Sequence, residues 1–226
     1  MIPGVRLIIL GRQGAGKGTQ CVRLSRHYVE PHISTGDMLR AAVKEESALG
    51  TKAKVFMDAG DLLPDEVMIG IVEERLDRPD ARTRGYIRDG FPRTVPQAVA
   101  LQQITAVRPL HLVVNLEVPR DLVLARIAGR RVCMDCGTNY SVTDRPKRNW
   151  SCDFCGGDVV QRDDDTEDAV NRRLDLYESQ TKPLIEFYSS TGDLVMVDGV
   201  GDPDEVLLRL VATIDARRER RRRPAP

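Results

Sequence analysis

Apolar and polar residues alternate along the chain in a way that predicts strands and helices in turn. Residues 5–10, VRLIIL, form a short apolar run with branched side chains, which is typical of a buried strand. Few helix breakers follow at residues 16–28, so a helix is expected there. Further strands are predicted at residues 32–34, 85–89, 111–118 and 193–199. The chain therefore begins with a strand, a turn and a helix.

Helices are expected between these strands. Residues 36–46 predict one, with Asp37 as its N-terminal cap. Others are predicted at residues 50–57, from Pro64 onward, and at 94–104, 119–130 and 202–218. The longest is indicated by apolar residues that recur every three or four positions: Val170, Leu174, Tyr177, Thr181, Leu184 and Tyr188. Strands that alternate with helices predict a mainly parallel sheet covered on both faces, with ligands beyond the carboxyl ends of the strands.

Composition changes this picture little. The chain has 226 residues, of which 41% are hydrophobic and 30% charged, as in an ordinary globular protein. Its first residues lack a basic segment and a small-residue cleavage site, and nowhere do about 18 apolar residues run together. We therefore expect a soluble, cytoplasmic protein without a membrane contact. Six arginines lie at residues 217–223. We expect residues 217–226 to be a basic tail, either the frayed, solvated end of a helix or disordered, with a weak polyanion contact as the alternative.

Residues 11–19 read GRQGAGKGT. The four glycines lack Cβ atoms, so successive backbone N–H groups can point into one concavity, and such a nest at a helix N-terminus binds anions. Gly11, Gly16 and Lys17 match G-x-x-x-x-G-K, in which the lysine reaches the outer phosphates of a nucleotide. The hydroxyl comes at Thr19, one position late, so the motif is matched only in part. A tight turn without a ligand is the alternative, and the phosphate loop is favoured.

Four of the five cysteines lie at residues 130–165, where helical periodicity is lost. Cys133, Cys136, Cys152 and Cys155 have the spacing C-x₂-C-x₁₅-C-x₂-C. Two such knuckles supply the four thiolates of a closed, structural zinc site, which leaves no position for a reacting water. Two disulfides are the alternative. The fifth, Cys21, is expected to pack as a small apolar residue on the first helix.

A zinc lobe also suggests a nucleic-acid binder with an ATPase core. Tyr140, Trp150 and Phe154 could stack on bases. The same lobe carries seven aspartates that would repel a phosphodiester backbone: Asp135, Asp144, Asp153, Asp158, Asp163, Asp164 and Asp165. Nucleic acid is therefore not an expected partner.

Four further strings place arginines beside aspartates and glycines: HISTGDMLR at 32–40, RDGFPRTVPQ at 88–97, RIAGRR at 126–131 and QRDDDTEDAVNRR at 161–173. Together with the glycine loop they resemble the adenylate kinases, in the long-lid form with a metal-binding lid. The resemblance runs from Val5 to Gly199 in the correct order. It implies a P-loop three-layer α/β/α core with a parallel five-stranded sheet, a helical AMP-binding lobe and a small zinc-containing lid.

The resemblance also implies the division of the chain and the roles of its residues. The core would comprise residues 1–33, 64–129 and 166–216, the AMP lobe 34–63 and the lid 130–165. The implied ATP-binding residues are Gly11, Gly14, Ala15, Gly16, Lys17, Gly18, Thr19, Arg126 and Arg130. The implied AMP-binding residues are Thr35, Gly36, Arg40, Gly90, Arg93, Gln97, Arg162 and Arg173, with Thr35 and Gln97 on the adenine. The implied catalytic residues are Lys17, Asp89, Arg93, Arg126, Arg130, Arg162 and Arg173.

In this interpretation Asp89 orders magnesium-bound water, and Asp164 and Asp165 link the lid to the core. The reaction would be MgATP + AMP ⇌ 2 ADP, with ATP, AMP and ADP as partners and a monomer as the expected state. Phosphoryl transfer needs positive charge more than covalent help, so His27, His32 and His111 are given packing or surface roles. Another monophosphate acceptor or GTP as donor is the alternative. A GTPase is disfavoured because no Asn-Lys-x-Asp string exists.

Two residues depart from the family pattern. Gln13 stands where the family usually has proline, which leaves the loop less restrained. Arg88 replaces an apolar strand residue, and it is expected either to reach solvent or to pair with an acid.

Overall fold

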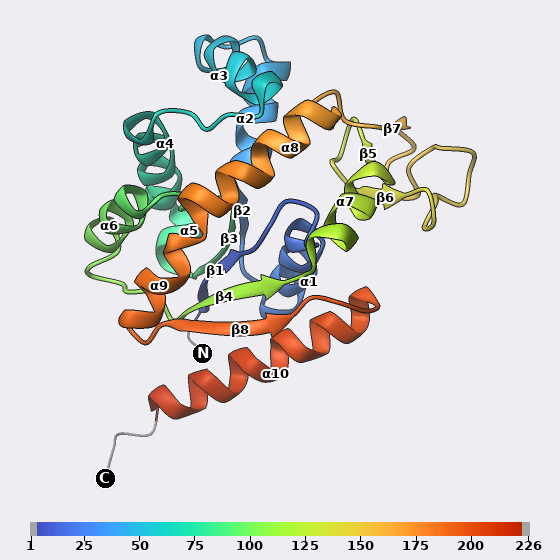
Figure 1. Cartoon of the computed structure of the whole chain (residues 1–226). Helices are drawn as coiled ribbons and strands as arrows, with labels where there is room; N and C mark the ends of the chain where they lie inside the picture. The colour runs from blue at the N-terminus through green and yellow to red at the C-terminus, as the bar shows by residue number, and fades with distance from the viewer. Residues whose placement is uncertain (1–3, 223–226) are drawn as a thin grey trace.

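The computed structural model describes residues 4–222, and its centre is a parallel sheet of five strands in the order β2-β3-β1-β4-β8 (Figure 1). The strands are β1 (Arg6–Leu10), β2 (His32–Ser34), β3 (Tyr86–Asp89), β4 (Leu112–Glu117) and β8 (Leu194–Asp198). All four pairings between them are parallel. The predicted parallel five-stranded sheet is confirmed.

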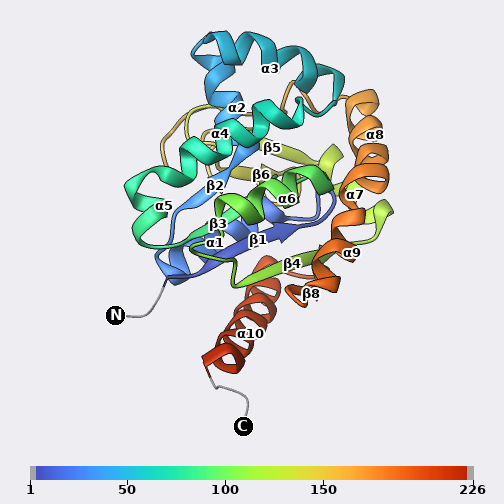
Figure 2. The ribbon, with the colours of Figure 1, turned by 90° about the vertical axis from the view of Figure 1, so that its left-hand side faces the viewer.

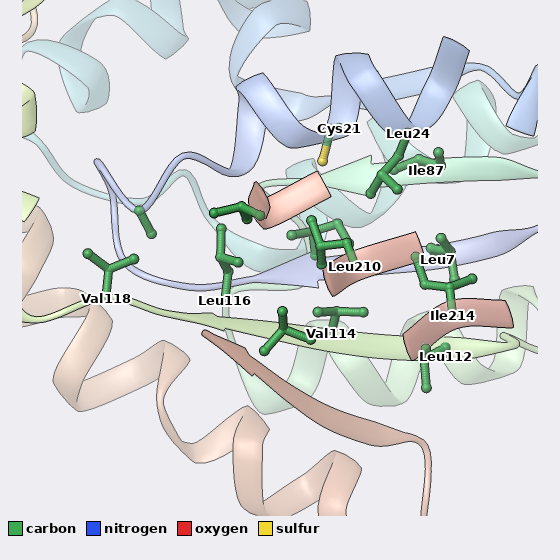
Figure 3. Packing of buried hydrophobic residues seen from close by; sticks show 14 of the residues in the cluster. Leu7, Cys21, Leu24, Ile87, Leu112, Val114, Leu116, Val118, Leu210 and Ile214 are labelled. Atoms are coloured by element: carbon green, nitrogen blue, oxygen red, sulfur yellow. The ribbon is translucent and has the colours of Figure 1, made fainter. Parts of the chain in front are cut away.

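Helices cover both faces of this sheet, as Figures 1 and 2 show. They are α1 (Lys17–Tyr28), α2 (Thr35–Lys44), α3 (Ala48–Ala59), α4 (Asp65–Asp77), α5 (Pro79–Thr83), α6 (Val95–Ile104), α7 (Arg120–Ala128), α8 (Glu167–Leu176), α9 (Pro183–Ser190) and α10 (Pro203–Arg222). One buried cluster joins a face of the sheet to α1 and α10, with Leu24 and Leu210 against Leu7 and Val114 (Figure 3). A second joins the other face to α4, α6 and α9. The three-layer arrangement predicted from the sequence is present.

The capping of α2 differs from the prediction. The N-cap is Ser34, in extended conformation, and its side chain accepts a hydrogen bond from the backbone N–H of Asp37. Asp37 lies instead in the first helical turn, where its negative charge favours the helix N-terminus. Both residue types suit a cap, and the strand that ends at Ser34 decides between them.

The long predicted helix at residues 170–188 is interrupted. A π-helical segment, η1 (Tyr177–Thr181), lies between α8 and α9. The backbone N–H of Lys182 donates to the carbonyl of Tyr177, five residues earlier, at 2.7 Å. Pro183 follows immediately, and the wider turn accommodates its ring and missing donor.

Two lobes project from the carboxyl-end edge of the sheet. Helices α2 and α3 form one of them (Figure 1). The other is an antiparallel sheet in the order β6-β5-β7, built from β5 (Arg130–Cys133), β6 (Asn139–Ser141) and β7 (Val159–Val160). These strands are too short for a periodic pattern to predict them. The lobes touch where Lys44 Nζ lies 3.9 Å from an Asp135 carboxylate oxygen.

In the part of the predicted basic tail that the structure describes, residues 217–222 form the end of a helix and are not disordered. Helix α10 continues to Arg222, and residues 223–226 lie outside the described range. Arginine is a good helix former, and Arg218 lies over the ring of Tyr28, 5.5 Å from its centroid. Within residues 4–222, no helix combines the length and apolar character needed to cross a bilayer.

Arg88 neither reaches solvent nor pairs with an acid, so both expectations for it are wrong. Its exposed fraction is 0%, and its three guanidinium nitrogens have no hydrogen-bond partner among the described residues. The guanidinium lies 4.7 Å from the ring centroid of Phe91 and 6.0 Å from that of Tyr86. Burial lowers the pKa of Arg88 to about 10. The cation–π contacts stabilise the buried guanidinium by about 2 kcal/mol. Removing its charge from water costs several kcal/mol, which is more.

Replacing Arg88 with methionine is therefore expected to stabilise the fold. Removal of the uncompensated charge should raise the free energy of unfolding by about 1 kcal/mol and the melting temperature by about 2–4 °C. Thermal unfolding of the purified variant measures this. Arg108→Met removes an exposed arginine instead and should change the melting temperature little. A large loss of stability in Arg88→Met alone would indicate that the guanidinium has a bound counter-charge.

Candidate active site

The glycine loop lies between β1 and α1, at the carboxyl edge of the sheet. Gly11, Gly14 and Gly16 have φ values of 140°, 80° and 94°, in the region that favours glycine. A Cβ on Gly14 would lie 2.7 Å from Cγ1 of Ile127, whereas one on Gly16 would meet nothing within 4 Å. Gly14 thus fits the loop tightly against α7, and Gly16 faces open space at the first turn of α1. That open space is where an anion can meet the N–H groups.

The side chain of Lys17 folds back over the glycine loop. Its Nζ donates to the backbone carbonyl of Arg12 at 2.9 Å. Burial lowers the pKa of Lys17, and the nearby Asp89 carboxylate opposes that shift. Sheet register explains the proximity, because Ile9 of β1 pairs with Asp89 of β3. A carboxylate and an ammonium therefore face the same space beyond the strand ends.

Two loop residues without a predicted contact fasten the loop to distant segments. Arg12 forms an ion pair with Glu178, donates to the carbonyl of Val118 at 3.3 Å and lies over the ring of Tyr177. The amide nitrogen of Gln13 donates to Asp165 at 3.3 Å. The π-helical turn presents Tyr177 and Glu178 to the loop, and no sequence spacing signals pairs so far apart. The side-chain hydrogen bond of Gln13 thus restrains the loop at the position where the ring of a proline would restrain its backbone.

The facing half of the site is built by the loop after β3. Arg93 Nε donates to the carbonyl of Gly90 at 2.9 Å, and a Cβ on Gly90 would collide with the Thr35 hydroxyl at 2.7 Å. Gln97 is 2% exposed: its Oε1 accepts from the backbone N–H of Arg93 at 2.8 Å, and its Nε2 donates to Asp65 at 2.7 Å. Asp65, which sequence reasoning missed, therefore orients Gln97. One N–H of this amide is left for a ligand.

Five of the predicted arginines are brought toward this space from four segments. Burial lowers the pKa of Arg93, and the neighbouring positive charges of Arg173 and Arg40 add to the effect. The pKa of Arg162 is lowered to about 10 by burial and then by Arg40 and Arg130. Like charges crowded in a partly buried space destabilise one another. Such a cluster is stabilised by an anion with several negative oxygens.

Two aspartates hold some of these arginines in place. Arg130 makes a two-point ion pair with Asp165, with Nε 2.8 Å from Oδ2. Arg173 donates to the Asp164 carboxylate at 2.8 Å and to the carbonyl of Met57 in α3 at 2.9 Å. Although burial alone would raise it, Arg173 holds the pKa of Asp164 below its usual value. These pairs connect the lid, the core and the α2–α3 lobe.

The remaining predicted residues lie around the glycine loop. Arg126 donates to the carbonyls of Gly199 and Ala15, at 3.3 and 3.4 Å. Arg40 is paired with Asp37, and Gly36 lies against the Arg40 guanidinium. A Cβ on Gly18 would lie 3.6 Å from the Asp89 carboxylate. Thr19 is in the first turn of α1.

The four lid cysteines form one cluster. The Cys133–Cys155 and Cys136–Cys152 sulfur separations are 3.4 and 3.5 Å, and all four sulfurs lie within 4.8 Å of one another. A tetrahedral zinc with Zn–S bonds of about 2.3 Å separates its sulfurs by about 3.8 Å. Gly137 and Gly156, with φ of 72° and 78°, close equivalent turns after each pair. The five cysteines are free thiols, so the cluster is compatible with a structural zinc.

Comparison with known proteins shows to which family the chain belongs. The model of the family described as adenylate kinase matches residues 9–193. The chain belongs to the adenylate kinase family. The adenylate kinase of Syntrophobacter fumaroxidans is 49% identical over 213 residues, which cover 93% of this chain and 100% of the relative. The adenylate kinase of Bacillus subtilis is 49% identical over 205 residues, 89% of this chain and 94% of the relative.

Membership of the adenylate kinase family makes this chain an enzyme, a nucleotide-binding kinase that transfers a phosphoryl group between ATP and AMP to give ADP. Kinases of the family use Mg²⁺ together with ATP. The matched residues include the glycine loop, the Arg93 loop and the lid.

Proposed function

We propose that two nucleotides bind end to end between the glycine loop and the Arg93 loop, and that a terminal phosphoryl group passes between them. ATP would bind on Gly11, Gly14, Ala15, Gly16, Lys17, Gly18 and Thr19, with Arg126 and Arg130 on its phosphates. AMP would bind on Thr35, Gly36, Arg40, Gly90, Arg93, Gln97, Arg162 and Arg173. The observation that carries this proposal is the convergence of Arg40, Arg93, Arg130, Arg162 and Arg173 on one space beside the loop.

The chemistry of the transfer suits this arrangement. The loose transition state spreads negative charge over the equatorial oxygens of the moving group, and planar guanidiniums meet such oxygens with paired hydrogen bonds. Lys17 would neutralise charge on the donor side. Arg93 and Arg173 would do so on the acceptor side, with Arg126, Arg130 and Arg162 around the transferred group. No protein nucleophile is needed.

Asp89 would position the metal that accompanies ATP. Its carboxylate is half-buried beside Lys17 and Gly18, and carboxylate oxygens with water are the ligands that Mg²⁺ prefers. When bound, Mg²⁺ would neutralise the negative charge that develops on the phosphates. Asp89 would hold this hydrated cation, and Thr19 would add its hydroxyl.

The two lobes would act as covers for the two nucleotides. We assign residues 34–63 to the AMP lobe and 130–165 to the lid, with 1–33, 64–129 and 166–216 as the core and 217–226 as a basic tail. Asp164 and Asp165 would hold Arg173 and Arg130 at the lid boundary. The guanidiniums of these two arginines would then reach the phosphates when the lid closes. Closure excludes water and thereby limits ATP hydrolysis. Cys133, Cys136, Cys152 and Cys155 would hold Zn²⁺ as a structural metal.

The cellular setting is inferred from chemistry alone. Free thiols suit a reducing compartment, which supports the cytoplasm as the location. Two lobes that must both move favour a monomer with ATP, AMP and ADP as its partners, without nucleic acid or membrane. Gln97, with an N–H left for an adenine edge, favours AMP over other monophosphates.

Purified protein is expected to convert ADP alone, at saturating Mg²⁺, into ATP and AMP until the reaction quotient reaches a value on the order of 1, because the bonds broken and formed are alike. Chromatographic separation of the three nucleotides measures it. Persistence of ADP as the sole species would remove the proposal. A parallel panel of CMP, UMP and GMP with ATP, and of GTP with AMP, tests the alternative substrates.

A further inference from the structure

A second group of metal-ligating side chains lies next to the glycine loop. Cys21 of α1, His32 of β2 and Asp89 of β3 place a sulfur, a ring nitrogen and a carboxylate oxygen within 4.8 Å of one another. Parallel pairing explains why two of them share one face of the sheet, because His32 is in register with Ile87 and Asp89 lies two residues further along β3. Helix α1 packs over this pair, and its Cys21 lies among the buried side chains of Figure 3.

The imidazole of His32 points to a ligand at this place. Its Nε2 is buried and has no hydrogen-bond partner within residues 4–222. A buried ring nitrogen without a partner carries a desolvation cost that a packing role does not explain. The neighbouring thiol is fully buried, whereas His32 and Asp89 are half-buried, so the cluster has one apolar side and one partly exposed side.

We propose that Cys21, His32 and Asp89 bind a thiophilic divalent cation of the zinc class, and that this cation inhibits the enzyme by occupying the carboxylate that serves Mg²⁺. The inhibition rests on the role proposed for Asp89 in holding Mg²⁺. The binding of the cation does not depend on that role. Neither Cys21 nor His32 belongs to the proposed nucleotide-binding or catalytic set.

The donor set decides which cation fits. Thiolate, imidazole and carboxylate together are typical of Zn²⁺ and similar ions, and three protein ligands leave a fourth position for water. Bond lengths of about 2.0–2.3 Å place tetrahedral ligands about 3.3–3.8 Å apart, so atoms that already lie within 4.8 Å of one another can reach this geometry by side-chain rotation. Mg²⁺ demands octahedral oxygen ligands and takes only Asp89 from this group.

A proton must leave when the cation binds. Burial raises the pKa of the Cys21 thiol well above its ordinary value, and Asp89 raises it further, against the opposing charge of Lys17. The step is R–SH + M²⁺ → R–S–M⁺ + H⁺, with the proton released to the buffer. A hard cation cannot compete with that proton, whereas a thiophilic one can.

The two zinc-class sites should fill in order. The lid offers four sulfurs and a closed coordination shell, whereas the cleft offers one sulfur and two harder donors. The first equivalent should enter the lid, and inhibition should begin only with the second. The enzyme would thus respond to zinc in excess of its structural need.

The experiment titrates chelator-buffered zinc into enzyme whose lid already holds one zinc, at saturating Mg²⁺. Bound metal is counted after desalting, and ADP disproportionation is followed in parallel. Wild type should bind a second equivalent and lose activity by about ten-fold or more, as expected when a catalytic electrostatic group is withdrawn. Cys21→Ala should bind one equivalent, show unchanged basal activity and stay within about two-fold of that rate. Val22→Ala, the adjacent and exposed position, should behave as wild type.

A spectroscopic readout separates binding from activity. Co²⁺ added to the zinc-loaded enzyme should produce a sulfur-to-cobalt charge-transfer band that Cys21→Ala lacks, and His32→Gln should weaken it. Equal zinc inhibition and equal cobalt spectra in wild type and Cys21→Ala would overturn the proposal, as would a second equivalent retained by that variant. If Cys21→Ala does not fold, His32→Gln carries the same comparison. Absence of any disproportionation before zinc is added would instead contradict the proposed function.

Discussion

Replacing Lys17 with methionine is expected to lower the rate of ADP disproportionation by about 10³-fold or more, a loss comparable to that of a charged group that stabilises the transferring phosphoryl. The ammonium of Lys17 lies on its own loop, 2.9 Å from the Arg12 carbonyl and close to Asp89. Methionine keeps most of the side-chain volume and removes the charge. Without the ammonium, the negative charge of the phosphates is less well neutralised, and this costs more in a partly buried site than in water.

The loss should appear mainly in kcat, because an interaction that strengthens in the transition state acts on the chemical step. Steady-state kinetics with ADP as the sole nucleotide measures kcat and KM, and a thermal melt checks that the variant folds. Lys52→Met provides the matched control, since Lys52 is exposed on α3 and its loss should leave both constants near those of wild type. Turnover in Lys17→Met within ten-fold of wild type, a modest catalytic effect, would contradict the assignment of this loop.

Replacing Cys133 and Cys136 together with serine is expected to remove about one equivalent of zinc per chain. The lid has a small buried cluster of its own, Cys133, Cys152 and Val159, with Tyr140 and Trp150 packed against it. A cluster of that size cannot order the lid by apolar burial alone. Loss of the metal should therefore lower the free energy of unfolding by about 2 kcal/mol or more and the melting temperature by about 4–8 °C.

Metal analysis and thermal unfolding of the same sample test this expectation. Met134→Ser serves as the control, because Met134 lies inside the first cysteine knuckle, is exposed and is no ligand. That variant should keep its zinc and its melting temperature. A double cysteine variant that melts at the wild-type temperature would argue against a structural metal, whatever its zinc content.

Local signals in the sequence predicted most of the fold. Apolar runs marked four of the five central strands directly, and proline marked a helix start at Pro64. These signals act within a few residues, because strand burial, caps and turns depend on neighbouring side chains. For the same reason, the glycine loop and the cysteine knuckles could be found without any tertiary information. The resemblance to adenylate kinases then supplied the arginines, which no periodicity distinguishes from surface charges.

The remaining errors arose where a distant segment decided the outcome. Arg88 carries no local sign that it lies inside the core against Phe91, and the alternation along β3 alone could not tell a buried face from an open one. The break at Tyr177–Thr181 is invisible to helical periodicity, because the apolar residues keep steps of three or four positions across it. At residues 217–222 the sequence left a helix end and a disordered segment open, and the structure shows the helix end, because α10 continues to Arg222.

By itself the sequence determined the order of the five central strands and the helices between them, the phosphate-binding loop, the cysteine cluster and the family. Only the tertiary structure decided that Gln97 is oriented by Asp65, that Arg12 is held by Glu178 and that Cys21, His32 and Asp89 meet. The reason is physical. Local propensities and motifs depend on near neighbours along the chain, whereas these contacts depend on how parallel strands bring distant residues to one edge of the sheet.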